Sequence, residues 1–153
     1  MTLARWIEVA CALVGGGCGG DGTVAVFADD YAATYHEVRT CRLSLDHDLM
    51  YIRVLASPDA IDAYRDRAVP FPVGSIVLKE QYADNDSACA GPIERYTVME
   101  RLDPGSSPGT LDWQWQKVSS AHKVQEVDGE RCIGCHELCG VAPDGYEGTC
   151  AVP

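Results

Sequence analysis

The sequence is poor in basic residues. Twelve lysines and arginines stand against 23 acidic residues, which gives the 153-residue chain a formal net charge of −11. This shortage of positive charge argues against nucleic acid and against an anionic membrane surface as partners. Internal repeats, low-complexity stretches and an internal domain boundary are also missing, so we expect one folded domain.

The sequence has no apolar run long enough to span a bilayer. Its N-terminus, MTLARWIEVACALVGGGCGG, carries one basic residue, Arg5, then a short apolar run to Val14 and small residues around Cys18. This pattern is typical of an export signal. We expect residues 1–17 to be a signal peptide, with Cys18 as a candidate for lipidation in a bacterial lipoprotein. A signal without lipidation and a misassigned start are the alternatives.

A regular alternation of strands and helices is absent as well. Residues 18–34, rich in glycine, aspartate and alanine, are expected to form a flexible tether, and the folded domain then spans 35–153. Ser57 and Pro58 predict a short helix within 57–68, because serine caps a helix and proline suits its first position. Strands and one helix together predict an α+β fold with an antiparallel sheet and a few short helices. The strands are predicted by β-branched and aromatic residues in 35–44, 49–56, the second half of 71–82, 96–102 and 111–120.

Cysteine, in contrast, is abundant. Eight cysteines in 153 residues suggest an oxidising compartment, in agreement with export. In RCIGCHELCG, residues 131–140, Cys132, Cys135 and His136 form a Cys-x-x-Cys-His pattern, which is the attachment pattern of c-type haem. Two thiols at this spacing can add to the two vinyl groups on one edge of the porphyrin. The adjacent histidine then becomes the proximal iron ligand.

Other sites built on the same residues are alternatives. Zinc would take four ligands, although structural zinc sites usually draw their ligand pairs from two separated segments. These ligands would be Cys132, Cys135, His136 and Cys139. A redox dithiol usually opens a helix in a βαβ unit, which is not expected here. A plain disulfide cluster is the third alternative. We favour one covalently bound haem c per chain.

The sequence offers no clear second ligand for a haem iron. Met50 and Met99 lie in predicted strands rather than on a loop that could reach over a haem. His36, His47 and His122 have no motif around them, and we expect each of them at the surface. We therefore predict an open sixth coordination position.

Four cysteines remain for disulfides once the signal segment, Cys18 and the haem motif are set aside. Cys139 and Cys150 flank a tail rich in glycine and proline that has few other means of ordering itself. Cys41 and Cys89 would then close a long loop. Four cysteines allow three connectivities, and this pairing is the one we prefer.

The segment 52–80, IRVLASPDAIDAYRDRAVPFPVGSIVLKE, resembles the characteristic segment of cytochrome P-460 and of its relative cytochrome c′-β. In that family a strand containing arginine leads to a helix, to a turn of the Phe-Pro-x-Gly type and to a strand that ends in Val/Leu-Lys-Glu. A strand containing tryptophan follows, matched here by DWQWQKV, and the haem motif comes last. The order and spacing match from about Tyr35 to His136.

The resemblance implies an exported, β-rich protein with one haem and a five-coordinate iron, often a homodimer. In cytochrome P-460 a lysine is bonded to the porphyrin rim and the altered haem oxidises hydroxylamine, whereas cytochrome c′-β lacks this bond and binds nitric oxide. The lysine of the family falls on Lys79. Ser75, Val77 and Lys79 share one face of a strand, so Lys79 is expected to point toward a covered pocket. The tail after His136 and Val73 in the turn depart from the family pattern.

These observations lead to three hypotheses. As an enzyme, the chain would oxidise hydroxylamine to nitrogen oxides and pass the electrons to an external acceptor. Cys132 and Cys135 would anchor the haem, His136 would be its axial ligand, and the catalytic crosslink would come from Lys79. As a binding protein, the chain would capture nitric oxide without turnover. As a lipoprotein stapled by disulfides, it would have no catalytic role. The expected location is the periplasm, or the outer membrane of a bacterium through a lipid at Cys18.

Overall fold

The chain folds around one antiparallel sheet. A computed structural model describes residues 22–66, 68–140 and 148–150. Six strands lie side by side in chain order, each antiparallel to the next. They are β1 (His36–Ser44), β2 (Met50–Ala56), β3 (Ile76–Tyr82), β4 (Arg95–Arg101), β5 (Trp113–Ser119) and β6 (Val124–Val127). The expected α+β fold with an antiparallel sheet and a few short helices is confirmed.

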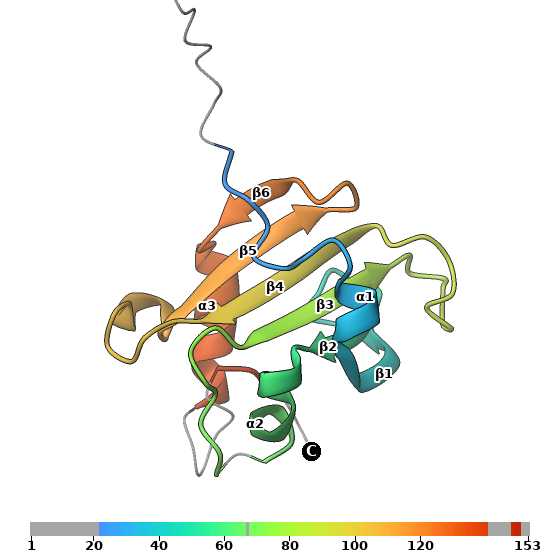
Figure 1. Cartoon of the computed structure of the whole chain (residues 1–153). Helices are drawn as coiled ribbons and strands as arrows, with labels where there is room; N and C mark the ends of the chain where they lie inside the picture. Colours follow the sequence, from blue (N-terminus) through green and yellow to red (C-terminus); the bar gives the residue numbers. More distant parts are fainter. Residues whose placement is uncertain (1–21, 67, 141–147, 151–153) are drawn as a thin grey trace, which may run out of the picture.

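Short helices accompany both faces of this sheet. They are α1 (Tyr31–Thr34), η1 (Pro58–Ala60), α2 (Ile61–Arg65), η2 (Pro108–Thr110), α3 (Glu130–His136) and η3 (Glu137–Cys139). Figure 1 shows α3 behind the sheet and α1 in front of it. Within the described ranges, no helix is long and apolar enough to cross a membrane.

Each face of the sheet packs its own core. On the first face, Val54, Val77 and Trp115 of the sheet pack with Tyr64 of α2 and Ile133 of α3. On the second face the buried side chains come from the sheet and from the segment before β1; they are Phe27, Tyr31, Leu55, Ile76, Leu78, Tyr96, Val98 and Val118. Because β3 lies in the middle of the sheet with both faces covered, all seven of its residues are buried.

The segment before β1 differs from the flexible tether expected over residues 18–34. Phe27 and Tyr31 are 4% and 5% exposed, and their rings pack edge to face. These two aromatic side chains complete the second core, so the folded domain begins before residue 35. The glycine, aspartate and alanine residues around them gave no sequence signal that these two aromatic side chains belong to the core.

Three local elements also differ from expectation. The helix expected within 57–68 is shorter, since η1 and α2 together end at Arg65. Ser57 does not cap it: its Oγ accepts a hydrogen bond from the backbone N–H of Ile76 instead. β6 was not expected, because four residues, VQEV, give too short a pattern. α3 was not expected either, because Gly134 lies in its middle and glycine is a poor helix former.

Glu80 is a buried carboxylate on the second face of β3, with 1% of the residue exposed. The hydroxyl of Tyr31 donates to its Oε1 at 2.8 Å, and the hydroxyl of Tyr82 donates to its Oε2 at 2.7 Å. Arg53 pairs with the same Oε2 at 2.6 Å. Burial, followed by hydrogen bonding, raises the pKa of both tyrosines, which keeps their phenols protonated as donors. Both carboxylate oxygens are thus satisfied, and the network joins α1, β2 and β3.

Replacing Arg53 with methionine should destabilise the protein, because Glu80 would stay buried after losing its cationic partner. Removing one partner of a buried ion pair costs about 3–5 kcal/mol, and because the Arg53 side chain is 35% exposed we expect less, about 2–3 kcal/mol. Urea unfolding measures the change. The exposed Arg65 of α2 provides the control, and Arg65→Met should shift stability by at most about 0.5 kcal/mol. Equal unfolding midpoints for the two variants would contradict the role of Arg53.

Candidate functional site

A cavity of about 430 Å³ lies on the first face of the sheet. Cofactor and small-molecule sites usually enclose about 300–1,000 Å³, so the cavity has the size of a ligand site. Its lining comes from the strands, from α3, from the loop 45–49 between β1 and β2, and from the end of the described chain. It includes Arg42, His47, Lys79, Arg95, Met99, Trp115, Lys117, Arg131, Cys132, Cys135 and His136.

α3 brings the Cys-x-x-Cys-His motif to this cavity. The helix begins after Gly129 and has Glu130 in its first turn, where a negative charge suits the positive end of the helix dipole. Cys132 and Cys135 are three residues apart and so lie on the same side of the helix. Both are free thiols, and burial raises the pKa of the Cys132 thiol. The helix therefore presents two unpaired thiols to one edge of the cavity.

His136 lies on the last turn of α3 and is 7% exposed. Its Nδ1 bonds the carbonyl oxygen of Gly148. Because a carbonyl can only accept, Nδ1 carries the proton and Nε2 keeps its lone pair. Burial, and then the charge of Lys79, lowers the pKa of His136 to about 4, so the ring is neutral at neutral pH. A neutral imidazole with a free ring nitrogen is the form that binds a metal.

Lys79 reaches the same cavity from the centre of the sheet. It lies between Val54 of β2 and Thr97 of β4, and 9% of the residue is exposed. Its Nζ is 3.1 Å from Nε2 of His47. Burial, and then the nearby charge of Arg42, lowers the pKa of Lys79 from 10.5 to about 8. The side chain points into a covered pocket, as the strand alternation predicted, and its amine is closer to the neutral, bond-forming state than that of an ordinary lysine.

His47 is the residue that sequence reasoning misplaced: expected at the surface, it lines the cavity. Burial, and then the charge of Lys79, lowers the pKa of His47 to about 3, so the ring is neutral. Because Lys79 donates to Nε2, Nδ1 must carry the proton and donate to Oγ of Ser44 at 2.7 Å. His47 has no motif around it, and its position between two predicted strands is the one signal that could have drawn attention to it.

The loop 45–49 holds His47 over the cavity. Asp48 and Leu49 have positive φ angles of 58° and 59°, which turn the chain tightly between β1 and β2. The Asp48 carboxylate pairs with Arg95 of β4 at 2.5 Å and with Arg131 of α3 at 2.9 Å. These two ion pairs join the loop to the sheet and to α3.

Comparison with known proteins identifies the family to which this arrangement belongs. The family model of cytochrome P460 matches residues 30–142. The chain belongs to the cytochrome P460 family. No curated protein matches the chain. The resemblance drawn from the sequence is thereby confirmed, and membership of the cytochrome P460 family implies a haem cofactor.

The residues around the cavity fit the haem that membership of the cytochrome P460 family implies. Haem carries two carboxylates on one edge, and five of the 12 lysines and arginines of the chain line the cavity: Arg42, Lys79, Arg95, Lys117 and Arg131. Three acidic side chains, those of Asp46, Asp48 and Glu126, line it as well. The lining is therefore net basic in a chain whose net charge is −11. Two thiols, a neutral imidazole and this excess of cations match the vinyl groups, iron and carboxylates of a haem.

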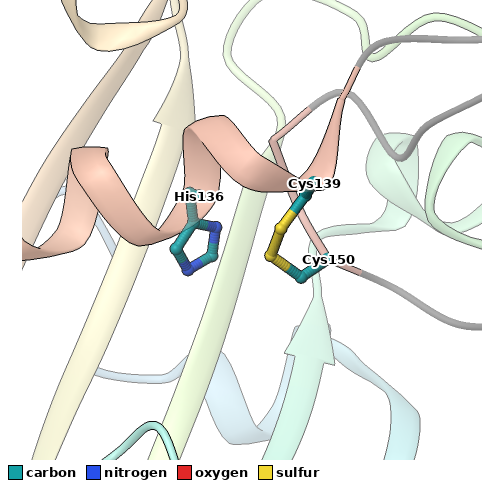
Figure 2. A group of neighbouring side chains, drawn as sticks. All are labelled: His136, Cys139 and Cys150. Atoms are coloured by element: carbon teal, nitrogen blue, oxygen red, sulfur yellow. A yellow bond between two sulfur atoms is a disulfide. The ribbon is translucent and has the colours of Figure 1, made fainter.

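The two disulfides correspond to the pairs preferred from the sequence, Cys41–Cys89 and Cys139–Cys150. The second disulfide leaves the zinc alternative one ligand short, since the Cys139 sulfur is bonded to Cys150 (Figure 2). The ligand atoms of His136, Cys139 and Cys150 lie within 4.8 Å of one another, but a disulfide offers no thiolate to a metal. The redox-dithiol alternative also loses support, because the sheet is antiparallel throughout.

The other candidate ligands lie as follows. His36 is exposed, as expected. His122 is partly buried rather than at the surface, and its Nδ1 lies 2.6 Å from Oδ1 of Asp29. Met99 lies in a strand, as expected, but it also lines the cavity and is 3% exposed. The signal segment and Cys18 fall outside the described residues.

The buried amine of Lys79 should make the stability of the haem-free protein depend on pH. Between the folded pKa of about 8 and the unfolded value of 10.5 the unfolded chain binds more protons, so stability rises with pH across this window. A Lys79→Met variant lacks the buried charge, and at about 1.36 kcal/mol per pKa unit it should be more stable than wild type by up to about 3 kcal/mol below pH 8.

Denaturant unfolding between pH 7 and pH 10.5, on protein produced without haem attachment, measures this difference. The stability advantage of Lys79→Met should shrink as the pH approaches 10.5. Lys123 is exposed, so Lys123→Met should show no such trend. A difference that stays constant with pH would show that the Lys79 amine has an ordinary pKa.

Proposed function

We propose that this chain is an exported c-type haem protein that oxidises hydroxylamine. One haem c would be bonded to the thiols of Cys132 and Cys135, with His136 as its axial ligand. Lys79 would be bonded to the porphyrin rim through a C–N bond that replaces one N–H and one C–H bond, with two protons released and two electrons taken up by an external oxidant. Membership of the cytochrome P460 family supports the haem. The proteins of this family are generally periplasmic, which supports export through residues 1–17, with Cys18 as a candidate lipid anchor.

The observation that carries this proposal is the buried amine of Lys79 in the same cavity as the haem motif. Lysine is rarely buried without a carboxylate partner, since desolvation of the ammonium group is costly. Lys79 instead faces a neutral imidazole, that of His47, at 3.1 Å. A lysine that served as an ordinary strand end would be solvated. Burial next to a hydrogen-bond acceptor is the setting that a bond-forming amine requires.

Hydroxylamine oxidation also requires a proton acceptor. Conversion of hydroxylamine to nitric oxide releases three protons together with three electrons. When bound, the haem would supply the redox centre through which electrons pass to an external acceptor. His47 is the candidate proton acceptor, at Nε2. After burial, the charge of Lys79 is the main cause of the low pKa of His47, so bonding of Lys79 to the porphyrin would remove this charge and make His47 more basic.

Capture of nitric oxide without turnover is the second candidate function. The apolar side chains of Val77, Met99 and Trp115 line one part of the cavity, and such a surface suits a small uncharged gas. The two functions would share the haem anchors and the axial ligand. The chemical state of Lys79 distinguishes them.

Expression with a haem-attachment system should give a polypeptide that carries one covalent haem. The intact mass should rise by one haem, and haem stain should persist on a denaturing gel. A Cys132→Ser/Cys135→Ser double variant should lose both signals, whereas Cys41→Ser/Cys89→Ser should keep them, because those two residues do not line the cavity. A wild-type protein that carries no haem would favour the hypothesis of a lipoprotein that is stapled by disulfides and has no catalytic role.

A Lys79→Met variant should keep its thioether-bound haem and lose the lysine crosslink. Peptide mass mapping reports the crosslink, and the optical spectrum of the reduced protein reports it as a red-shifted Soret band. Hydroxylamine turnover with an artificial electron acceptor should fall at least about tenfold, equivalent to about 1.4 kcal/mol in the barrier. Nitric oxide binding should remain.

Lys117 provides the matched control, since it lines the same cavity from β5. Lys117→Met should keep the crosslink and its red-shifted Soret band, both of which Lys79→Met should lose. If wild type and Lys79→Met share one spectrum and one rate, the nitric oxide-binding function takes precedence.

A further inference from the structure

The end of the described chain returns to the segment that carries the axial histidine. The backbone N–H of Gly148 donates to the carbonyl oxygen of Gly140 at 3.3 Å, and Cys150 is bonded to Cys139. Both anchor points lie close after α3, since Cys139 ends η3, three residues after His136, and Gly140 is the next residue. Figure 2 shows the disulfide beside the His136 ring. The disulfide therefore ties the described C-terminal segment, residues 148–150, to the neighbourhood of His136.

The direction of the Gly148 carbonyl is fixed by its surroundings. Gly148 has a φ angle of 77°, in the left-handed region that favours glycine. A Cβ at this position would lie 3.3 Å from Cδ1 of Leu111 and 3.6 Å from Nε1 of Trp113. Gly148 and Thr149 are both buried. This backbone, held two residues later by the Cys139–Cys150 disulfide, directs its carbonyl oxygen to Nδ1 of His136.

The hydrogen bond and the position of the ring have separate causes. The His136 ring packs edge to face on Trp115, with ring centroids 4.6 Å apart. Trp115 is held by β5, and its indole N–H donates to the carbonyl oxygen of Thr110 at 3.0 Å. The hydrogen bond to Nδ1, in contrast, comes from the C-terminal segment. Release of that segment should weaken the hydrogen bond and leave the ring in the cavity.

This hydrogen bond bears on the chemistry of a bound iron. A hydrogen bond from Nδ1–H gives the imidazole partial anionic character and makes Nε2 a stronger donor to the metal. Stronger donation favours ferric over ferrous iron and lowers the reduction potential. A protein that takes electrons from a substrate depends on that potential.

We propose that the Cys139–Cys150 disulfide positions the Gly148 carbonyl on Nδ1 of His136 and thereby lowers the reduction potential of the haem iron. The inference rests on the proposed function, because it requires a haem bound at His136. Gly148 and Cys150 lie beyond residues 30–142, which the family model matches. The Gly148 carbonyl and one of the two disulfide cysteines thus lie outside the matched segment, whereas His136 and Cys139 lie within it.

The test compares the haem-loaded wild type with a Cys139→Ser/Cys150→Ser double variant. The variant should keep its covalent haem, and its ferrous iron–histidine stretching band in resonance Raman spectra should move to lower frequency. Outer-shell contacts of a metal ligand typically change metal affinity by about 10–100-fold. We expect a change on the order of tenfold in the preference for ferrous iron, which raises the potential by about 59 mV for a one-electron couple.

The second disulfide of the chain supplies the matched control. Cys41–Cys89 joins residues 48 apart in sequence, against 11 for Cys139–Cys150. Its loss should therefore cost at least as much stability in the chain-entropy picture. Neither Cys41 nor Cys89 lines the cavity. Cys41→Ser/Cys89→Ser should leave the Raman band and the potential at the wild-type values.

If the Cys139→Ser/Cys150→Ser double variant cannot be produced in folded form, a second measurement on the wild type tests the same inference. The loaded wild type is treated with a phosphine, and alkylation of Cys139 and Cys150 verifies that this disulfide has opened. The Raman band should shift as in the variant. An unchanged band and potential after opening, or equal shifts in the Cys41/Cys89 control, overturn the inference alone. A wild type that takes up no haem overturns the proposed function and the inference together.

Discussion

The arrangement of the whole molecule depends on the burial of both faces of β3. A strand that is covered on both sides must bury every side chain, and β3 carries two ionisable residues in succession, Lys79 and Glu80. Alternation sends them to opposite faces. The charge of Glu80 is paired within the chain, because Arg53 and two tyrosine hydroxyls contact its carboxylate. Lys79 has a neutral imidazole for its neighbour, that of His47. One buried charge is thus part of the folded framework, and the other faces a cavity.

Much of the framework could be predicted from the sequence because it rests on local patterns. The alternation in DWQWQKV and in the segment ending at Lys79 predicted strands and their faces, and the Cys-x-x-Cys-His motif predicted a haem, the cofactor that membership of the cytochrome P460 family implies. What failed has physical reasons as well. α3 carries Gly134 and follows a four-residue strand, so neither helix propensity nor strand length signalled it. Phe27 and Tyr31 are two aromatic residues in a polar stretch, and their burial depends on a sheet formed later in the chain.

The position of His47 shows the limit of motif-based reasoning most clearly. Its place in the cavity depends on two residues with positive φ, Asp48 and Leu49, and on ion pairs from Asp48 to Arg95 and Arg131. These partners lie 47 and 83 residues away along the chain. A sequence pattern has no means of recording contacts at that separation. The role of His47 as candidate general base therefore depends on the three-dimensional position of the loop 45–49 and is not visible in the sequence.

The charges around the cavity connect this geometry with the cofactor. Arg42 and Lys79 are close enough that the arginine lowers the pKa of the lysine, and Arg95 and Arg131 share one carboxylate, that of Asp48. Like charges gathered in a partly buried space destabilise a chain that holds no anion there. The two carboxylates of a haem would offset this repulsion, so binding of the cofactor and stability of the fold are coupled. The second face of β3 needs no such compensation, because its charges are paired within the chain. The excess of positive charge thus lies on the face where we propose that the haem binds.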